Sequence, residues 1–123
     1  MIRGIMTNCR EAVVSIRLRG NQGYELDVDA IVDTGFTASL TLPLSIVTAL
    51  DLVRNGGGNA ILADGSNSGF DIYPVEIDWD GASKEINCYA VGDDALIGMR
   101  LLRGYELRVE VETGGLVEIK KMP

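Results

Sequence analysis

The chain has 123 residues, 46% of them hydrophobic and 24% charged, which is typical of one globular domain covering residues 1–123. It contains no histidine, and this excludes Ser-His-Asp and Cys-His catalysis and any zinc site built from histidine and cysteine. The formal net charge of −7 argues against nucleic-acid binding, and no apolar run approaches the ~20 residues of a membrane span.

The first residues lack the apolar core of a signal peptide, so we expect a cytoplasmic protein that binds neither membrane nor nucleic acid. Cys9 and Cys88 are far apart and show no Cys-x-x-Cys spacing. This favours two buried free thiols over a disulfide. With histidine absent, carboxylates are the remaining groups for acid–base chemistry.

Turn signals at short intervals predict an all-β domain. Residues 11–18 alternate imperfectly between polar and apolar side chains, and residues 24–32 return as a second strand after a turn at residues 20–23. The two strands form a hairpin that ends directly before Asp33.

The segment after this hairpin contains the one credible helix, at residues 43–52. Pro43 suits a first helical turn, and Leu44, Val47 and Leu50 lie near one face. Glycine-rich residues 55–59 are expected to form a flexible connection.

Two further hairpins are predicted in the second half of the chain. Residues 60–63 and 70–77 read as strands around a small, polar tip. A strand at residues 84–91 and an apolar run at residues 95–98 follow, and then a helical turn at residues 99–102. The second hairpin joins residues 107–111 and 116–119.

The motif Asp33-Thr34-Gly35 stands at the apolar end of the strand at residues 24–32. A carboxylate on a tight glycine turn after a buried strand is held rigidly and can point into a cleft. The same tripeptide also suits a plain β-turn, in which Asp and Gly are common. Two other segments decide between these interpretations.

Three segments, in this order, resemble the single-domain retropepsin-like aspartic proteases, in particular their short bacterial members. Residues 30–37 look like the active-site loop, Ala63-Asp64-Gly65-Ser66 looks like the flap tip, and residues 95–102 are similar to the apolar-apolar-Gly segment and C-terminal helix. The resemblance implies an all-β, closed β-barrel of the acid-protease fold. This barrel corresponds to one of the two lobes of a pepsin-like enzyme and contains one or two short helices.

The resemblance further implies an aspartic endopeptidase that uses no cofactor and no metal. Peptide hydrolysis needs a base and an acid, and two carboxylates sharing one proton supply both, because like charges roughly 3 Å apart cannot both ionise. The chain has a single Asp-Thr-Gly. The second carboxylate must therefore come from Asp33 of another copy, which makes a homodimer part of the hypothesis.

The resemblance assigns a role to each residue of the motif. Asp33 is the acid–base residue, Thr34 bonds across the dimer axis, and Gly35 allows close backbone approach to the substrate. Residues 107–119 are the candidate dimer interface. Binding of an extended peptide substrate is assigned to Thr37, Ala63, Asp64, Gly65 and Ser66.

Gly98 is expected to pack beneath the active-site loop, but two nearby positions depart from the family pattern. The family often carries Asp or Asn where Arg100 stands, and related bacterial chains often carry Gly where Ala38 stands. Loss of the polar contacts that brace the loop motivates an alternative, a catalytically weak peptide-binding or dimerisation module of the same fold. A phosphoryl-transfer loop is a third interpretation, but it requires a second Asp where Gly35 stands.

Overall fold

The computed structural model describes residues 1–61 and 64–123, and most of its elements are β-strands. The strands are β1 (Ile2–Met6), β2 (Ala12–Arg19), β3 (Glu25–Val32), β4 (Leu40–Leu42), β5 (Gly56–Ile61), β6 (Asn67–Trp79), β7 (Ala82–Ala90), β8 (Ala95–Ile97), β9 (Tyr105–Val109) and β10 (Leu116–Lys121). The helices α1 (Leu44–Ala49) and α2 (Met99–Leu102) are short, and a 3-10 turn lies at Asn21–Gly23.

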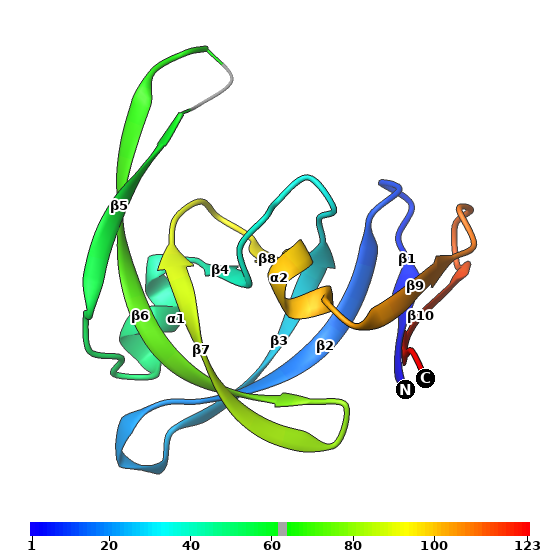
Figure 1. Cartoon of the computed structure of the whole chain (residues 1–123), viewed down its shortest axis with the longest axis horizontal. Helices are drawn as coiled ribbons and strands as arrows, with labels where there is room; N and C mark the ends of the chain where they lie inside the picture. Colours follow the sequence, from blue (N-terminus) through cyan, green and yellow to red (C-terminus); the bar gives the residue numbers. More distant parts are fainter. Residues whose placement is uncertain (62–63) are drawn as a thin grey trace.

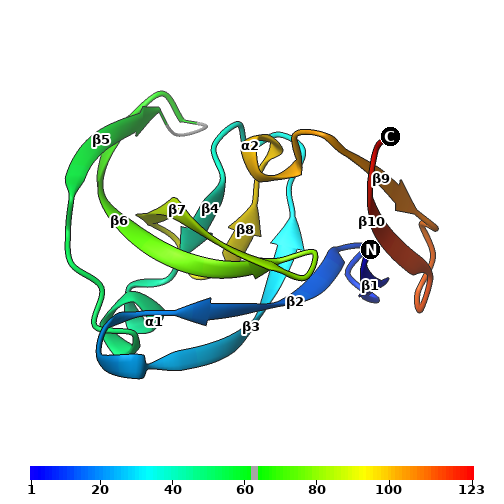
Figure 2. The ribbon, with the colours of Figure 1, turned by 60° about the horizontal axis from the view of Figure 1, so that its bottom comes forward.

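The ten strands of the described residues form one sheet in the order β5-β6-β7-β4-β8-β3-β2-β1-β10-β9. An additional pairing of β6 with β2 closes the six strands from β6 to β2 into a barrel (Figure 1). The expected all-β closed barrel with short helices is thereby confirmed. Strands β1, β10 and β9 continue from β2 beyond the barrel, and we call them the terminal sheet (Figure 2).

The hairpin of β2 and β3 forms as predicted. Its strands are antiparallel, with Val14 opposite Ala30 and Ile16 opposite Val28, and all four side chains are buried. Alternate residues of a strand point to opposite faces, so this register places one apolar row in the core and the intervening polar row in solvent. The hairpin ends at Val32 and delivers residue 33 to one end of the barrel.

Two parallel pairings cross the middle of the barrel. β3 runs parallel to β8, with Val32 opposite Ile97, and β4 runs parallel to β7, with Leu40 opposite Cys88. β4 is also antiparallel to β8, so these two short strands lie between the hairpin strand β3 and the long strand β7. Leu40 and Ile97 are completely buried, which anchors the chain on both sides of the loop that follows β3.

The expectations for two segments need correction. The helix predicted at residues 43–52 is shorter, Leu44–Ala49, and the Leu44 side chain is 62% exposed although Val47 and Leu50 are buried. Residues 56–59, expected to be part of a flexible connection, belong to β5 and pair with β6. Their backbone groups complete the ladder without side chains, and a Cβ at residue 58 would lie only 2.9 Å from the Phe70 ring.

The two cysteines are both free, but only Cys88 is buried, and Cys9 is exposed. The expectation of two buried thiols is therefore wrong for Cys9, which lies in a tight turn between β1 and β2. No helix among residues 1–61 and 64–123 has the length and apolarity needed to cross a membrane.

Candidate active site

Asp33 is held by three hydrogen bonds directly after β3. Its backbone N–H donates to the Ile97 carbonyl (2.9 Å), and its own carbonyl accepts from the Phe36 N–H (3.1 Å), which closes a tight turn. The Gly35 N–H donates to Asp33 Oδ1 (2.9 Å). Asp33 is half-buried, whereas Thr34 and Gly35 are exposed. One carboxylate oxygen is thus fixed by the loop itself, and this sets the orientation of the carboxylate.

Gly98 lies beneath this loop, as expected. Its N–H donates to the Ser39 carbonyl (3.0 Å), and the next N–H, of Met99, donates to the Phe36 carbonyl (2.8 Å). A Cβ at residue 98 would lie 2.1 Å from the Ala38 carbonyl oxygen, closer than real Cβ contacts. Only glycine therefore lets the β8–α2 junction approach the loop this closely.

Arg100 braces the same loop with its backbone. The Arg100 N–H donates to the Ala38 carbonyl (3.2 Å), a bond available to any residue except proline. The guanidinium is exposed, and within the described part of the chain it forms no ion pair. An arginine at position 100 is therefore compatible with the backbone contacts that support the loop.

Thr41 is a further support that sequence reasoning missed. Its side chain is only 3% exposed, and its hydroxyl donates to the Asp94 carbonyl (3.1 Å) while accepting from the Leu96 N–H (3.0 Å). This hydroxyl ties β4 to the start of β8, next to the strand that holds Asp33. The one signal in the sequence was a polar residue inside the apolar run Leu40-Thr41-Leu42.

The hairpin tip predicted to act as a flap is described from Asp64 onward, and Ala63 lies outside the described residues. Asp64 Oδ1 accepts hydrogen bonds from the Ser66 N–H (2.9 Å) and the Ser66 hydroxyl (2.6 Å). These bonds stabilise the charged form and lower the pKa of Asp64. Gly65 adopts φ +86°, so a tight turn forms the tip, and all three residues are exposed.

Aromatic rings connect the Asp33 loop to the hairpin of β5 and β6. Phe36, in the loop, contacts Tyr89 of β7 edge-to-face with ring centroids 6.0 Å apart. Tyr89 in turn stacks on Phe70 of β6, at a centroid distance of 4.4 Å. Thr37, the other predicted substrate-binding residue, is exposed beside Phe36. Figure 1 shows the loop after β3 and the far end of the β5–β6 hairpin on the same, upper side of the view.

A cavity of about 530 Å³ lies beside Asp33, on the side of the terminal sheet. Among the residues that line it are Asp33, Thr34, Arg10, Asp94, Val109 and Val111. The described residues of the hairpin tip, Asp64, Gly65 and Ser66, do not line it. No motif in the sequence singles out Asp94 or Arg10, and Arg10 adopts a left-handed φ of 60°. Within the described residues, no hydrogen bond joins the Asp33 carboxylate to another side chain.

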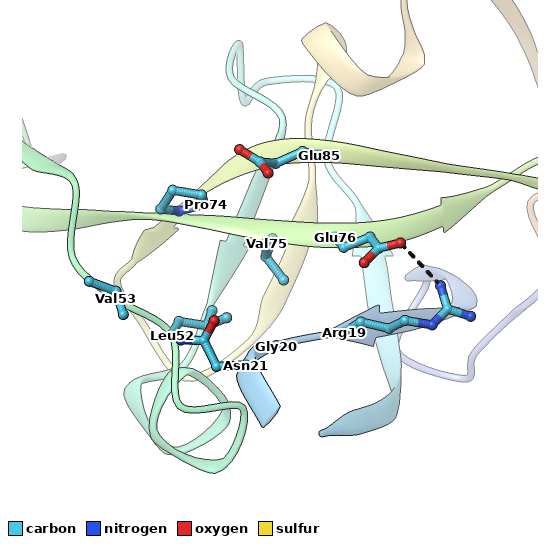
Figure 3. A pocket seen from close by; sticks show the side chains of 9 residues that line it. All are labelled: Arg19, Gly20, Asn21, Leu52, Val53, Pro74, Val75, Glu76 and Glu85. Carbon is cyan, nitrogen blue, oxygen red and sulfur yellow. Dashed lines mark ion pairs between the residues drawn. The ribbon is translucent and has the colours of Figure 1, made fainter. Parts of the chain in front are cut away.

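A second cavity, of about 280 Å³, contains none of the predicted site residues (Figure 3). Its wall includes Arg19, which forms ion pairs with Glu25 (3.0 Å) and Glu76 (3.8 Å). Arg19 Nη2 also donates to Asp78 Oδ2 (2.8 Å), and these bonds lower the pKa of Asp78 and raise that of Arg19. Because Arg19 lies on β2 and Asp78 on β6, this cluster fastens the seam that closes the barrel.

Among residues 1–61 and 64–123, no group of three or more cysteine and carboxylate side chains is arranged to hold a metal ion. No family model matches the chain, and no curated protein matches it. The candidate site therefore has to be judged on its own geometry.

Proposed function

We propose that this chain is an aspartic endopeptidase in which Asp33 from each of two identical subunits forms the catalytic dyad. The proposal rests on the contacts that hold the Asp33 loop in place. Its carboxylate directly follows β3, a strand with one face in the core. One carboxylate oxygen accepts the Gly35 N–H, and Gly98 and α2 support the loop from below. A carboxylate that serves only as a surface charge does not need such support.

The proposed reaction uses two carboxylates that share one proton. The ionised carboxylate takes a proton from water, whose oxygen attacks the peptide carbonyl carbon, and the protonated carboxyl gives its proton to the carbonyl oxygen. The resulting diol then loses a proton to the second carboxylate while the first protonates the nitrogen, and the C–N bond breaks. Both carboxyl groups return to their starting states. One subunit supplies one Asp-Thr-Gly, so a single chain does not complete this cycle.

The substrate in this proposal is an extended peptide held between the Asp33 loop and the hairpin of β5 and β6. Thr37 is exposed beside Phe36 and offers a hydroxyl on the loop side. The hairpin would contribute main-chain hydrogen bonds from Ala63, Asp64, Gly65 and Ser66, and closing over the peptide would exclude water. The contacts of the Tyr89 ring with Phe36 and Phe70 support the idea that the hairpin would move on a rigid base.

The alternative is a peptide-binding or dimerisation module with little catalysis. Its motivation was the loss of bracing at Arg100, and the backbone bonds to Phe36 and Ala38 weaken that motivation. The two functions differ in one experiment, the comparison of wild-type protein with Asp33→Asn on a diverse peptide mixture between about pH 3 and pH 7.

We expect cleavage by the wild type to rise faster than linearly with protein concentration, because the active species is a dimer. Asp33→Asn should lower the rate about 10²-fold or more. Asp29→Asn is the matched control, since Asp29 is an exposed carboxylate on the same strand, and it should retain full activity. Equal cleavage by wild type and Asp33→Asn would refute the assignment of Asp33. Peptide binding without cleavage by either protein would favour the module.

A further inference from the structure

Among the strands that the structure describes, none pairs with the outer edge of β9. β9 is the last strand of the sheet and pairs only with β10 (Figure 2). Its sequence, Tyr105-Glu106-Leu107-Arg108-Val109, contains no proline or lysine, the residues that most often protect a free edge, and its two charged side chains are of opposite sign. An edge of this kind is suited to pairing with another strand.

The hydrogen bonds at the two ends of the β9–β10 pair fix which backbone groups face the free edge. The Glu110 N–H donates to the Leu116 carbonyl (2.9 Å), and the Met122 N–H donates to the Gly104 carbonyl (3.0 Å). Antiparallel strands alternate between residues that bond to the partner and residues that bond away from it. Glu106 and Arg108 therefore direct their backbone groups to β10, and Tyr105, Leu107 and Val109 direct theirs to the open edge.

The charged side chains of the terminal sheet form rows that end at this edge. In one row, Arg3, Glu118 and Arg108 lie opposite one another on β1, β10 and β9. Arg108 Nη1 lies 3.0 Å from Glu118 Oε1, and Arg3 Nε lies 4.0 Å from Glu118 Oε2. In the other row, Lys120 of β10 lies opposite Glu106 of β9. One row thus presents a positive charge at the edge and the other a negative charge.

We propose that β9 pairs antiparallel with β9 of a second copy of this chain, around a two-fold axis at Leu107. In this register Glu106 lies opposite Arg108 of the second copy, and Arg108 opposite its Glu106. A row of alternating charge then crosses the dimer from Arg3 through Glu118 and Arg108 to Glu106 and Lys120 of the second copy. Tyr105 and Val109 exchange backbone hydrogen bonds across the axis, as do the two Leu107 residues.

Other registers are less favourable. Centring the pair on Glu106 or on Arg108 places identical charges directly opposite each other, which is destabilising. A shift by one residue that pairs Glu106 with Leu107 places the charged row against the apolar row. Centring on Val109 pairs Arg108 with Glu110 of the second copy, but it puts Glu106 opposite Glu112 and pairs β9 with residues 110–113, which lie beyond the strand. Centring on Tyr105 leaves Glu106 opposite a glycine. Only the axis at Leu107 uses the whole strand and pairs opposite charges twice.

This inference rests on the proposed function for its catalytic meaning, because it names the surface through which the second Asp33 would be brought to the first. Val109, at the end of β9, lines the same cavity as Asp33 and Thr34. The interface is therefore continuous with the candidate site.

The test uses two charge reversals, Glu106→Arg and Arg108→Glu, with association measured by sedimentation velocity over a range of concentrations. Each variant alone places like charges opposite each other twice, and its dimer dissociation constant should rise about tenfold or more. An equal mixture of the two variants restores opposite charges at both positions. It should form a heterodimer about as tight as the wild-type dimer, which also shows that both chains fold. Glu112→Arg, an exposed charge reversal beyond the strand, should associate like the wild type.

Three results would overturn the interface: a monomeric wild type, variants that associate like the wild type, or a mixture that fails to recover association. Cleavage assays on the same samples separate the two proposals. Undiminished dimerisation of the reversals together with cleavage that depends on Asp33 would refute the β9 interface and leave the protease standing. Charge-dependent dimerisation without cleavage would confirm the interface and refute the protease.

Discussion

Gly98 lies so close beneath Phe36 that a Cβ atom at residue 98 would come within 2.6 Å of the ring carbon Cδ2. The same Cβ would lie 2.1 Å from the Ala38 carbonyl oxygen, a backbone atom that cannot rotate away. The position of the Asp33 loop is therefore set by the absence of a side chain more than half the chain length later in the sequence.

Gly98→Ala should consequently push the loop away from α2. We expect a loss of about 1–3 kcal/mol in the free energy of unfolding, typical of an overpacked core, measured by urea denaturation. Gly69→Ala is the matched control, because the nearest atom to a Cβ there is 3.7 Å away. If Gly98→Ala and Gly69→Ala had the same free energy of unfolding, the loop would be able to move away from residue 98 without loss of stability.

Thr41→Val should destabilise the protein although it preserves shape. The substitution leaves the Leu96 N–H and the Asp94 carbonyl without their hydroxyl partner. Unpaired buried polar groups cost about 1–3 kcal/mol, and urea denaturation would measure the loss. Thr48→Val changes the same atoms at an exposed position of α1 and should alter stability by less than about 0.5 kcal/mol. Equal effects of the two changes would contradict the role given to Thr41.

The strands that alternate polar and apolar residues could be predicted from the sequence. Residues 14, 16 and 18 face the core because β2 is covered on one side only. β4 escaped prediction because Leu40, Thr41 and Leu42 are all buried, so no alternation marks the strand. The predicted strand at residues 60–63 covers only the end of β5, because Gly56, Gly57 and Gly58 pair through their backbone and have no side chains to show a pattern.

The candidate site was predictable where it depends on local sequence and not where it depends on topology. The turn at Asp33 and the contact of Gly98 followed from motifs in the chain. Arg10 lines the cavity beside Asp33 because it lies in the turn between β1 and β2, and Asp94 lines it because β8, which directly follows, pairs with β3. Nothing in their neighbouring residues indicates this position.

Cys88 should behave as an inert thiol. Burial raises its pKa from the ordinary value near 9 to about 12, so it stays protonated in the folded protein. A thiol reagent near pH 8 should modify the exposed Cys9 rapidly and Cys88 only after urea unfolds the chain. Rapid modification of both thiols in the folded protein would contradict the burial of Cys88.

Because the pKa of Cys88 is higher in the folded protein than in the unfolded chain, its free energy of unfolding depends on pH in the alkaline range. Below pH 9.0 both the folded and the unfolded chain keep the Cys88 proton, and the contribution of the neutral thiol to the free energy of unfolding is fully present. As the pH rises toward about 12, the unfolded chain loses its proton first, and the contribution is lost. Cys88→Ala should lack this part of the alkaline decline in urea denaturation measured at a series of pH values. An identical decline in both proteins would assign it to other groups.

Asp78 gives the opposite dependence at acid pH. Its hydrogen bonds to Arg19 lower its pKa below the ordinary value of 3.8. The contribution is therefore present above that value and is lost as the pH falls through the lowered pKa. Asp78→Asn should be less stable than the wild type at neutral pH, and the difference should shrink in acid. A difference that stays constant with pH would mean that the amide disturbs packing instead.

The parallel pairing of β3 with β8 also sets the order in which the molecule can be assembled during synthesis. The Asp33 N–H has its hydrogen-bond acceptor only once Ile97 has been synthesised, and the loop has its support only once Gly98 has been synthesised. A nascent chain of which only the first half has emerged from the ribosome thus contains the Asp-Thr-Gly sequence but lacks the structure that orients it. Under the proposed function, such a chain is unable to cleave its neighbours, and hydrolytic capacity arises only after the segment that contains Ile97 and Gly98 has also emerged.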